Sequence, residues 1–84
     1  MTLELAIKMV IGVTMDDLRD RERTRDRLFG RAIYAKLSGL PRAQIARNLG
    51  KVFTSATCYL NLYERLWNTD EEFRSIALEI QSLI

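Results

Sequence analysis

Histidine is absent from this 84-residue sequence, and cysteine and proline each occur only once. Without histidine, the chain lacks the commonest general base and the commonest nitrogen ligand for metal ions. The single cysteine, Cys58, excludes an intrachain disulfide and a cysteine-based metal site. Catalytic motifs and phosphate-cradling glycine loops are also missing. We therefore expect no enzymatic activity, no small-molecule substrate, no cofactor and no bound metal.

Long apolar segments are missing as well. The longest strongly apolar run, Met9 to Val13, is far too short to cross a bilayer. The amino-terminal stretch T-L-E-L-A-I-K carries an acid early and has no basic cluster, which does not fit a secretory signal. We expect a cytoplasmic protein that makes no membrane contact.

Helix-forming residues make up much of what is present. Leu, Ala, Arg and Glu are abundant, and only four glycines and one proline interrupt them. A chain of this length forms one small domain. The sequence therefore predicts a single all-α domain, residues 1–84, built from five or six helices.

Apolar periodicity and capping residues predict where these helices lie. Thr2 caps the first helix, and Thr14 with Asp17 forms a capping box for a short second helix. Thr69 with Glu72 forms another capping box, for the last helix. The expected ranges are 3–11, a short segment after Thr14, 23–37, 41–49, 54–67, and from Thr69 to the end.

Positive charge is concentrated in the first part of the chain. Residues 1–50 carry ten Lys and Arg against six Asp and Glu, whereas residues 51–84 carry three against five. Arg19, Arg23, Arg27 and Arg31 recur every four residues, so they share one face wherever the segment is helical. Such a ridge suits a phosphate backbone. The interleaved acids leave a second interpretation open, in which this is an ordinary solvated face.

The segment I-A-R-N-L-G-K-V-F-T-S-A-T combines a helix, a glycine turn and a second helix. This spacing fits a DNA-binding helix-turn-helix, and it fits an ordinary pair of antiparallel helices equally well. Thr54, Ser55, Thr57 and Asn61 form a polar strip that favours DNA, because hydroxyls and amides contact phosphates and base edges.

Three aromatic residues, Tyr59, Tyr63 and Trp67, are spaced four residues apart on the expected fifth helix. They could stack on bases. Their coincidence with the apolar stripe of that helix favours a buried seam instead.

Several motifs in order resemble one known family. They are V-T-M-D-D-L-R, then an arginine-rich segment that leads into G-R-A-I-Y-A-K-L, then I-A-R-N-L-G-K, and finally L-Y-E-R-L-W-N-T-D-E-E-F. This order resembles the C-terminal DNA-binding domain of the bacterial replication initiator DnaA, which has a Trp-repressor-like helix-turn-helix fold. The resemblance covers nearly the whole chain.

The resemblance implies a way of binding double-stranded DNA. An arginine at the start of the family's long helix enters the minor groove, and Arg31 holds that place here. The helix-turn-helix enters the major groove. The family's signature there is Arg-Asp-His, a small residue and Thr, and the corresponding residues are Lys51, Val52, Phe53, Thr54 and Ser55.

Val52 and Phe53 depart from the family pattern, because neither side chain can exchange hydrogen bonds with base edges. Both can still touch a thymine methyl group, which leaves open a different, A·T-rich site. The initiator's ATPase region is also missing, so the chain is either a free-standing relative or an excised domain. Met1 and the capped first helix favour a complete small protein.

Two functional hypotheses follow. In the first, a nucleoid-associated protein binds DNA and acts as a transcriptional regulator or competes with an initiator for its sites. Arg31 probes the minor groove, Lys51, Thr54, Ser55 and Thr57 face the major groove, and Arg23, Arg27, Arg42 and Arg47 hold phosphates. In the second, the scaffold is a protein-interaction module in which Val52 and Phe53 contact a partner protein or a second copy of the chain.

Overall fold

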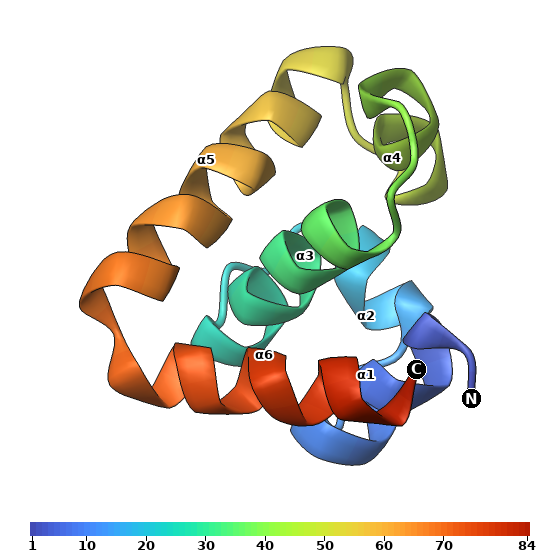
Figure 1. Cartoon of the computed structure of the whole chain (residues 1–84). Coiled ribbons are helices and arrows are strands. Elements are labelled where there is room, and N and C mark those ends of the chain that lie inside the picture. The colour runs from blue at the N-terminus through green and yellow to red at the C-terminus, as the bar shows by residue number, and fades with distance from the viewer.

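The computed structural model describes all residues, 1–84, and contains helices only, which confirms the predicted all-α class. Figure 1 shows the arrangement, with α3 in the middle of the molecule and the other helices around it. The six helices are α1 (Leu3–Ile11), α2 (Met15–Arg19), α3 (Arg25–Leu37), α4 (Arg42–Asn48), α5 (Phe53–Thr69) and α6 (Glu71–Leu83).

Hydroxyl caps begin the first three helices. The Thr2 side chain accepts a hydrogen bond from the Leu5 N–H, and Thr24 accepts one from the Arg27 N–H. Thr14 and Asp17 form both hydrogen bonds of a capping box at the start of α2, which confirms that prediction. Gly12 ends α1 in the left-handed region, at φ 85°. These local signals explain why the ends of α1 and the start of α2 were predictable.

The other helix boundaries differ from the predictions. The capping box expected at Thr69 is wrong, because Thr69 is the last residue of α5 and its hydroxyl donates to the Arg65 carbonyl. Asp70 caps α6 instead, accepting from the Phe73 N–H. α3 begins at Arg25 rather than at 23, and α5 runs beyond the expected range of 54–67 at both ends.

The core is a single cluster of 17 buried apolar residues centred on α3. α3 packs against all five other helices. Gly30 lies at the tightest approach, because a Cβ atom there would lie 2.7 Å from Leu18 Cδ2 and 3.1 Å from Val13 Cγ2. The glycine therefore lets α2 and the segment that precedes it lie directly on α3.

Aromatic side chains join α3, α5 and α6. The Phe73 ring meets Phe29 at 5.0 Å and Tyr63 at 5.3 Å, both edge to face, and Tyr63 stacks on Trp67 at 5.9 Å. Tyr63 is buried, and Tyr59 and Trp67 are half-buried. Of the predicted aromatic seam, Tyr63 therefore belongs to the core, and Tyr59 and Trp67 pack against it. None of the helices combines the length and the apolar character needed to cross a membrane.

Candidate nucleic-acid interface

The helices α4 and α5 are joined by a four-residue turn, Leu49–Val52. Leu49 is fully buried under the turn, and Gly50 has φ 63°, a conformation that side chains other than glycine's rarely adopt. The N–H of Lys51 donates to the carbonyl of Ala46 at 2.8 Å, which closes the end of α4. The buried Leu49 side chain and the hydrogen bond to Ala46 thus hold the turn in place. The turn also sets the direction of α5.

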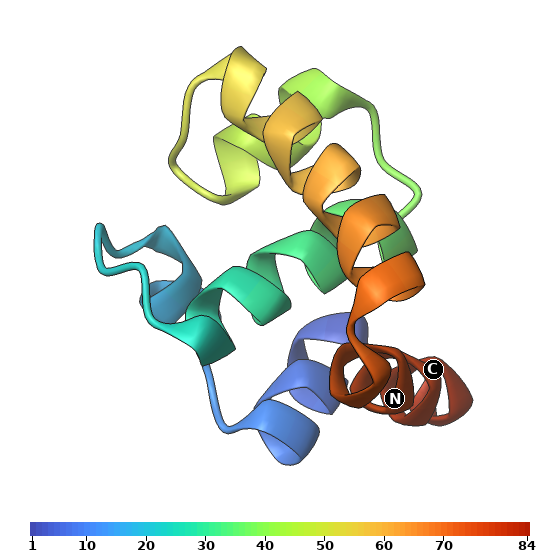
Figure 2. The same cartoon turned by 90° about the vertical axis from the view of Figure 1, so that its left-hand side faces the viewer.

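The loop between α2 and α3, residues 20–24, lies against this turn, and Figure 2 shows both on the same edge of the molecule. Arg19 Nε donates to the Asn48 carbonyl at 2.8 Å. Lys51 Nζ donates back to the carbonyls of Asp20 at 2.9 Å and Arg19 at 3.3 Å. These reciprocal hydrogen bonds join the end of α2 to the end of α4.

Arg31 does not lie where a groove-reading side chain must lie. Its side chain is only 2 % exposed. Its Nε donates to the Leu18 carbonyl at 2.8 Å, and Nη2 donates to the Asp20 carbonyl at 2.5 Å. The expected insertion of Arg31 into a minor groove disagrees with this placement, because the guanidinium instead binds free carbonyls at the end of α2.

Lys51 is half-buried and also binds carbonyls of the protein itself. Its two acceptor carbonyls belong to the same end of α2 that Arg31 binds. Burial lowers the pKa of the Lys51 ammonium, and the nearby Arg31 lowers that pKa further. The charge expected to face the major groove therefore serves first to hold the turn against α2.

Arg27 is surrounded by carboxylates, so its expected role in holding a phosphate does not fit. It lies 3.4 Å from Asp17, 3.6 Å from Asp20 and 2.5 Å from Glu22, and its side chain is 18 % exposed. The arginine ridge is also interrupted. Arg19 ends α2 and Arg23 lies in the following loop, so the four arginines do not share one helix. The regular spacing in the sequence was misleading, because it spans a helix break.

The segment 27–63 has basic residues but no acidic ones, a feature that the predicted arginine ridge did not take into account. It contains no Asp or Glu, whereas it contains six basic residues. Three exposed arginines on or next to this segment, Arg42, Arg47 and Arg65, have no carboxylate within ion-pair distance. Arg21 and Arg23 in the 20–24 loop are also exposed and unpaired, although Asp20 and Glu22 lie in the same loop. We call this set of five arginines, on the 20–24 loop, α4 and α5, the basic edge.

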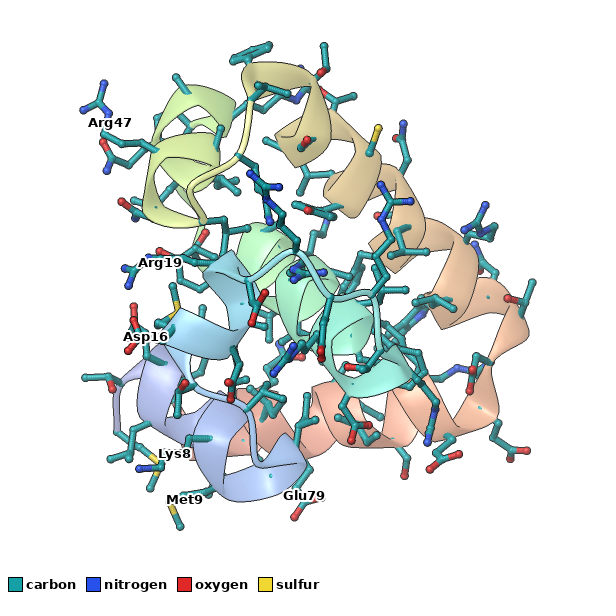
Figure 3. The ribbon with its side chains drawn as sticks, turned by 180° about the vertical axis from the view of Figure 1, so that it is seen from behind. Lys8, Met9, Asp16, Arg19, Arg47 and Glu79 are labelled. Atoms are coloured by element: carbon teal, nitrogen blue, oxygen red, sulfur yellow. The ribbon has the colours of Figure 1, made fainter.

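Sequence reasoning missed two members of the basic edge, Arg21 and Arg65. What distinguishes these two arginines is the lack of an acidic partner. That property depends on the tertiary structure, so the spacing of residues in the sequence does not reveal it. Arg23, Arg42 and Arg47 were expected to be exposed cations, and all three are exposed. In Figure 3, Arg47 lies at the top of the molecule and Lys8 at the bottom with Met9 and Glu79, while Arg19 lies between them.

The first turn of α5 carries the remaining predicted contacts. Thr54 is exposed, whereas Ser55 and Thr57 are half-buried. Val52 and Phe53 are 69 % and 55 % exposed, so both project from the tip of the turn. Neither side chain therefore belongs to the core. The tip combines one apolar pair with hydroxyl groups that begin immediately after it.

No cluster of acidic, cysteine or histidine side chains could hold a metal ion. Comparison of the chain with protein-family models, with curated proteins and with solved structures gives no match. The function must therefore be argued from the residues of the basic edge and from the α4–α5 unit.

Proposed function

We propose that this protein binds double-stranded DNA through the basic edge, with α4 and α5 acting as a helix-turn-helix. The observation that carries the proposal is the group of five exposed arginines without acidic partners, three of which, Arg42, Arg47 and Arg65, lie on or next to a segment that has no acidic residue. Unpaired guanidiniums bind phosphate strongly, since they displace the counterions that surround DNA.

The local structure of α5 supports the same function. Val52 precedes this 17-residue helix and provides no side-chain hydrogen bond to its first turn. The free N–H groups and the helix dipole together favour an anion at that position. Thr54, the first hydroxyl on the helix, is exposed beside them. A phosphate or a base edge that approaches the tip therefore meets donors from the backbone and from side chains.

The residue roles differ from those that the resemblance to the DnaA domain implies. Arg42 and Arg47 bind phosphates on one side of α5, and Arg21 and Arg23 do so on the other. Thr54 and the apolar pair Val52 and Phe53 face the major groove, where the pair touches thymine methyl groups. Arg31 and Lys51 position the turn against α2. Major-groove recognition with apolar contacts favours A·T-rich sites.

The test is the salt dependence of binding to a fluorescent duplex, followed by anisotropy. The Arg47→Ala variant should reduce the slope of log affinity against log salt by about one, since one phosphate contact is lost. The Lys8→Ala variant is the matched control, because Lys8 is also exposed and has no acidic partner but lies at the other end of the molecule. Equal slopes for both variants would contradict the proposal.

One observation favours a second function, the binding of a protein partner through the tip. Two neighbouring apolar side chains, Val52 and Phe53, are more than half exposed there, and such pairs act as anchors in protein interfaces. The Phe53→Ser variant separates the two functions. Loss of self-association in sedimentation with unchanged DNA affinity would favour the protein interface, and the opposite pattern would favour DNA.

A further inference from the structure

A pocket of about 660 Å³ opens between the loop after α2, the first turns of α3 and the middle of α5. Pockets of this size hold complete small molecules and are much larger than a single inorganic anion needs. Three arginines line it, Arg23, Arg31 and Arg65, and no acidic residue does. The remaining wall is mixed, with Leu28 and Leu62 beside polar side chains that include Ser55 and Asn61.

Arg31 presents one unused nitrogen to this pocket. Its Nε and Nη2 atoms bind the Leu18 and Asp20 carbonyls, whereas Nη1 has no hydrogen-bond acceptor in the protein. No buried side-chain nitrogen or oxygen in the structure lacks a partner. The Nη1 atom must therefore be reachable from outside, although the whole side chain is only 2 % exposed. Because Arg31 lines the pocket, we infer that this nitrogen is reached from it.

The charge on Arg31 also lacks a counter-ion. No carboxylate lies within ion-pair distance of its guanidinium, and both of its acceptors are neutral carbonyls. A buried cation is normally paired, because transfer out of water costs several kcal/mol. Arg23 and Arg65, the other two arginines of the pocket, are unpaired as well. Burial is the main cause of the lowered pKa of Lys51, and Arg31 lowers that pKa further while Asp20 raises it.

We propose that the pocket binds a small phosphorylated compound with a planar body, of the nucleoside monophosphate class. The phosphate takes donors from Arg31 Nη1 and from the guanidiniums of Arg23 and Arg65, which suit its oxygens. The planar body lies against the apolar wall and the Tyr59 ring, where bases stack well. Ser55 and Asn61 supply hydrogen bonds to its edge.

This inference does not rest on DNA binding, because it depends on Arg31 and on the open pocket beside it rather than on α4. A phosphate of a DNA backbone shares the same chemistry and could approach the same arginines. The phosphate could therefore come from a free nucleotide or from DNA. A pocket built for a free nucleotide binds the mononucleotide when no duplex is present. Titration with a mononucleotide alone therefore separates them.

The experiment is calorimetric titration of the full chain with adenosine monophosphate at about 150 mM salt, where long-range attraction is screened. Saturable binding is expected, and adenosine without the phosphate should bind at least roughly tenfold more weakly. The Arg65→Met and Arg23→Met variants should each weaken binding by about tenfold, which corresponds to the loss of one charged hydrogen bond. Both arginines are exposed, so their replacement should leave the fold intact.

The Arg47→Met variant is the matched control, because Arg47 is exposed and unpaired but does not line the pocket. Its affinity for adenosine monophosphate should equal that of the wild type. An equal loss in this control, or equal binding of adenosine, would overturn the proposal. Absence of saturable mononucleotide binding would overturn it too, and if duplex DNA is still bound then the arginines belong to the DNA interface instead.

Discussion

At the scale of single residues, Arg31 links two helices of the fold. Its hydrogen bonds to the Leu18 and Asp20 carbonyls tie α3 to the end of α2. The Arg31→Met variant keeps much of the side-chain volume but leaves both carbonyls without this donor. We expect the free energy of unfolding to fall by about 2–3 kcal/mol. Urea denaturation measures this fall, with Arg42→Met as an exposed control expected to change by less than about 0.5 kcal/mol.

Arg31 would be shown to have no structural role if its replacement changed the stability no more than the control does. The sequence showed only that an arginine follows Gly30 near the start of a helix. It could not show that the side chain turns inward, because its partners are backbone carbonyls more than ten residues away. The same holds for Lys51, whose acceptors lie 31 and 32 residues away.

Asp17 is a residue whose effect depends on pH. The backbone N–H of Thr14 donates to its carboxylate and, as the main cause, holds the pKa of Asp17 below its ordinary value of 3.8. Because the folded-state pKa is lowered, the stabilisation is complete well above pH 3.8 and is lost as the pH falls through the lowered value. The wild type should therefore be more stable than Asp17→Asn at pH 6, and the difference should shrink under acid.

Asp16→Asn provides the comparison, because the Asp16 side chain is 94 % exposed and takes no part in the capping box. The only ion pair of Asp16, with Arg19, is at the surface, so the unfolding free energy of this variant at pH 6 should stay within about 0.5 kcal/mol of that of the wild type. A stability difference for Asp17→Asn that stays constant from pH 6 to below the lowered pKa would rule out the charged cap. The Thr14–Asp17 pair is also the feature that the sequence predicted best, since both of its members lie within one helical turn.

At the scale of elements, the packing of α2 on α3 depends on Gly30. A methyl group there would lie 2.7 Å from the buried Leu18 side chain, so Gly30→Ala forces one of the two helices to shift. Overpacking costs about 1–3 kcal/mol, and alanine regains up to about 1 kcal/mol of helix propensity. We expect a net loss of roughly 1 kcal/mol by thermal or urea unfolding. A more stable variant would show that the contact relaxes without strain.

Prediction of elements from the sequence succeeded where the signals are local and failed where they are not. The caps at Thr2 and Thr14 and the glycine end of α1 placed α1 and the start of α2. The sequence pattern of Thr69 and Glu72 also fits a capping box. In the structure, however, α5 continues through Thr69, and Asp70 caps α6. Thr69 and Asp70 are both possible caps, and the packing of the helices determines which of them caps α6. The local sequence pattern carries no information about that packing.

At the scale of the whole molecule, the unpaired positive charge is unevenly distributed. The basic edge carries five arginines without acidic partners, although Asp20 and Glu22 lie in the same loop as Arg21 and Arg23. This uneven distribution gives an approaching polyanion a preferred orientation. The sequence revealed the excess of positive charge in the first fifty residues. The location of the unpaired charge followed only when the ion pairs of Arg25, Arg27 and Lys36 were known.

The most direct test of DNA binding through the basic edge is an NMR titration of the labelled chain with a short A·T-rich duplex. The largest amide shift changes are expected in the 20–24 loop, the 49–52 turn and the first turns of α5, while α1 and α6 stay unchanged. Absence of any shift at low salt, or changes centred on α1 and α6, would contradict the account.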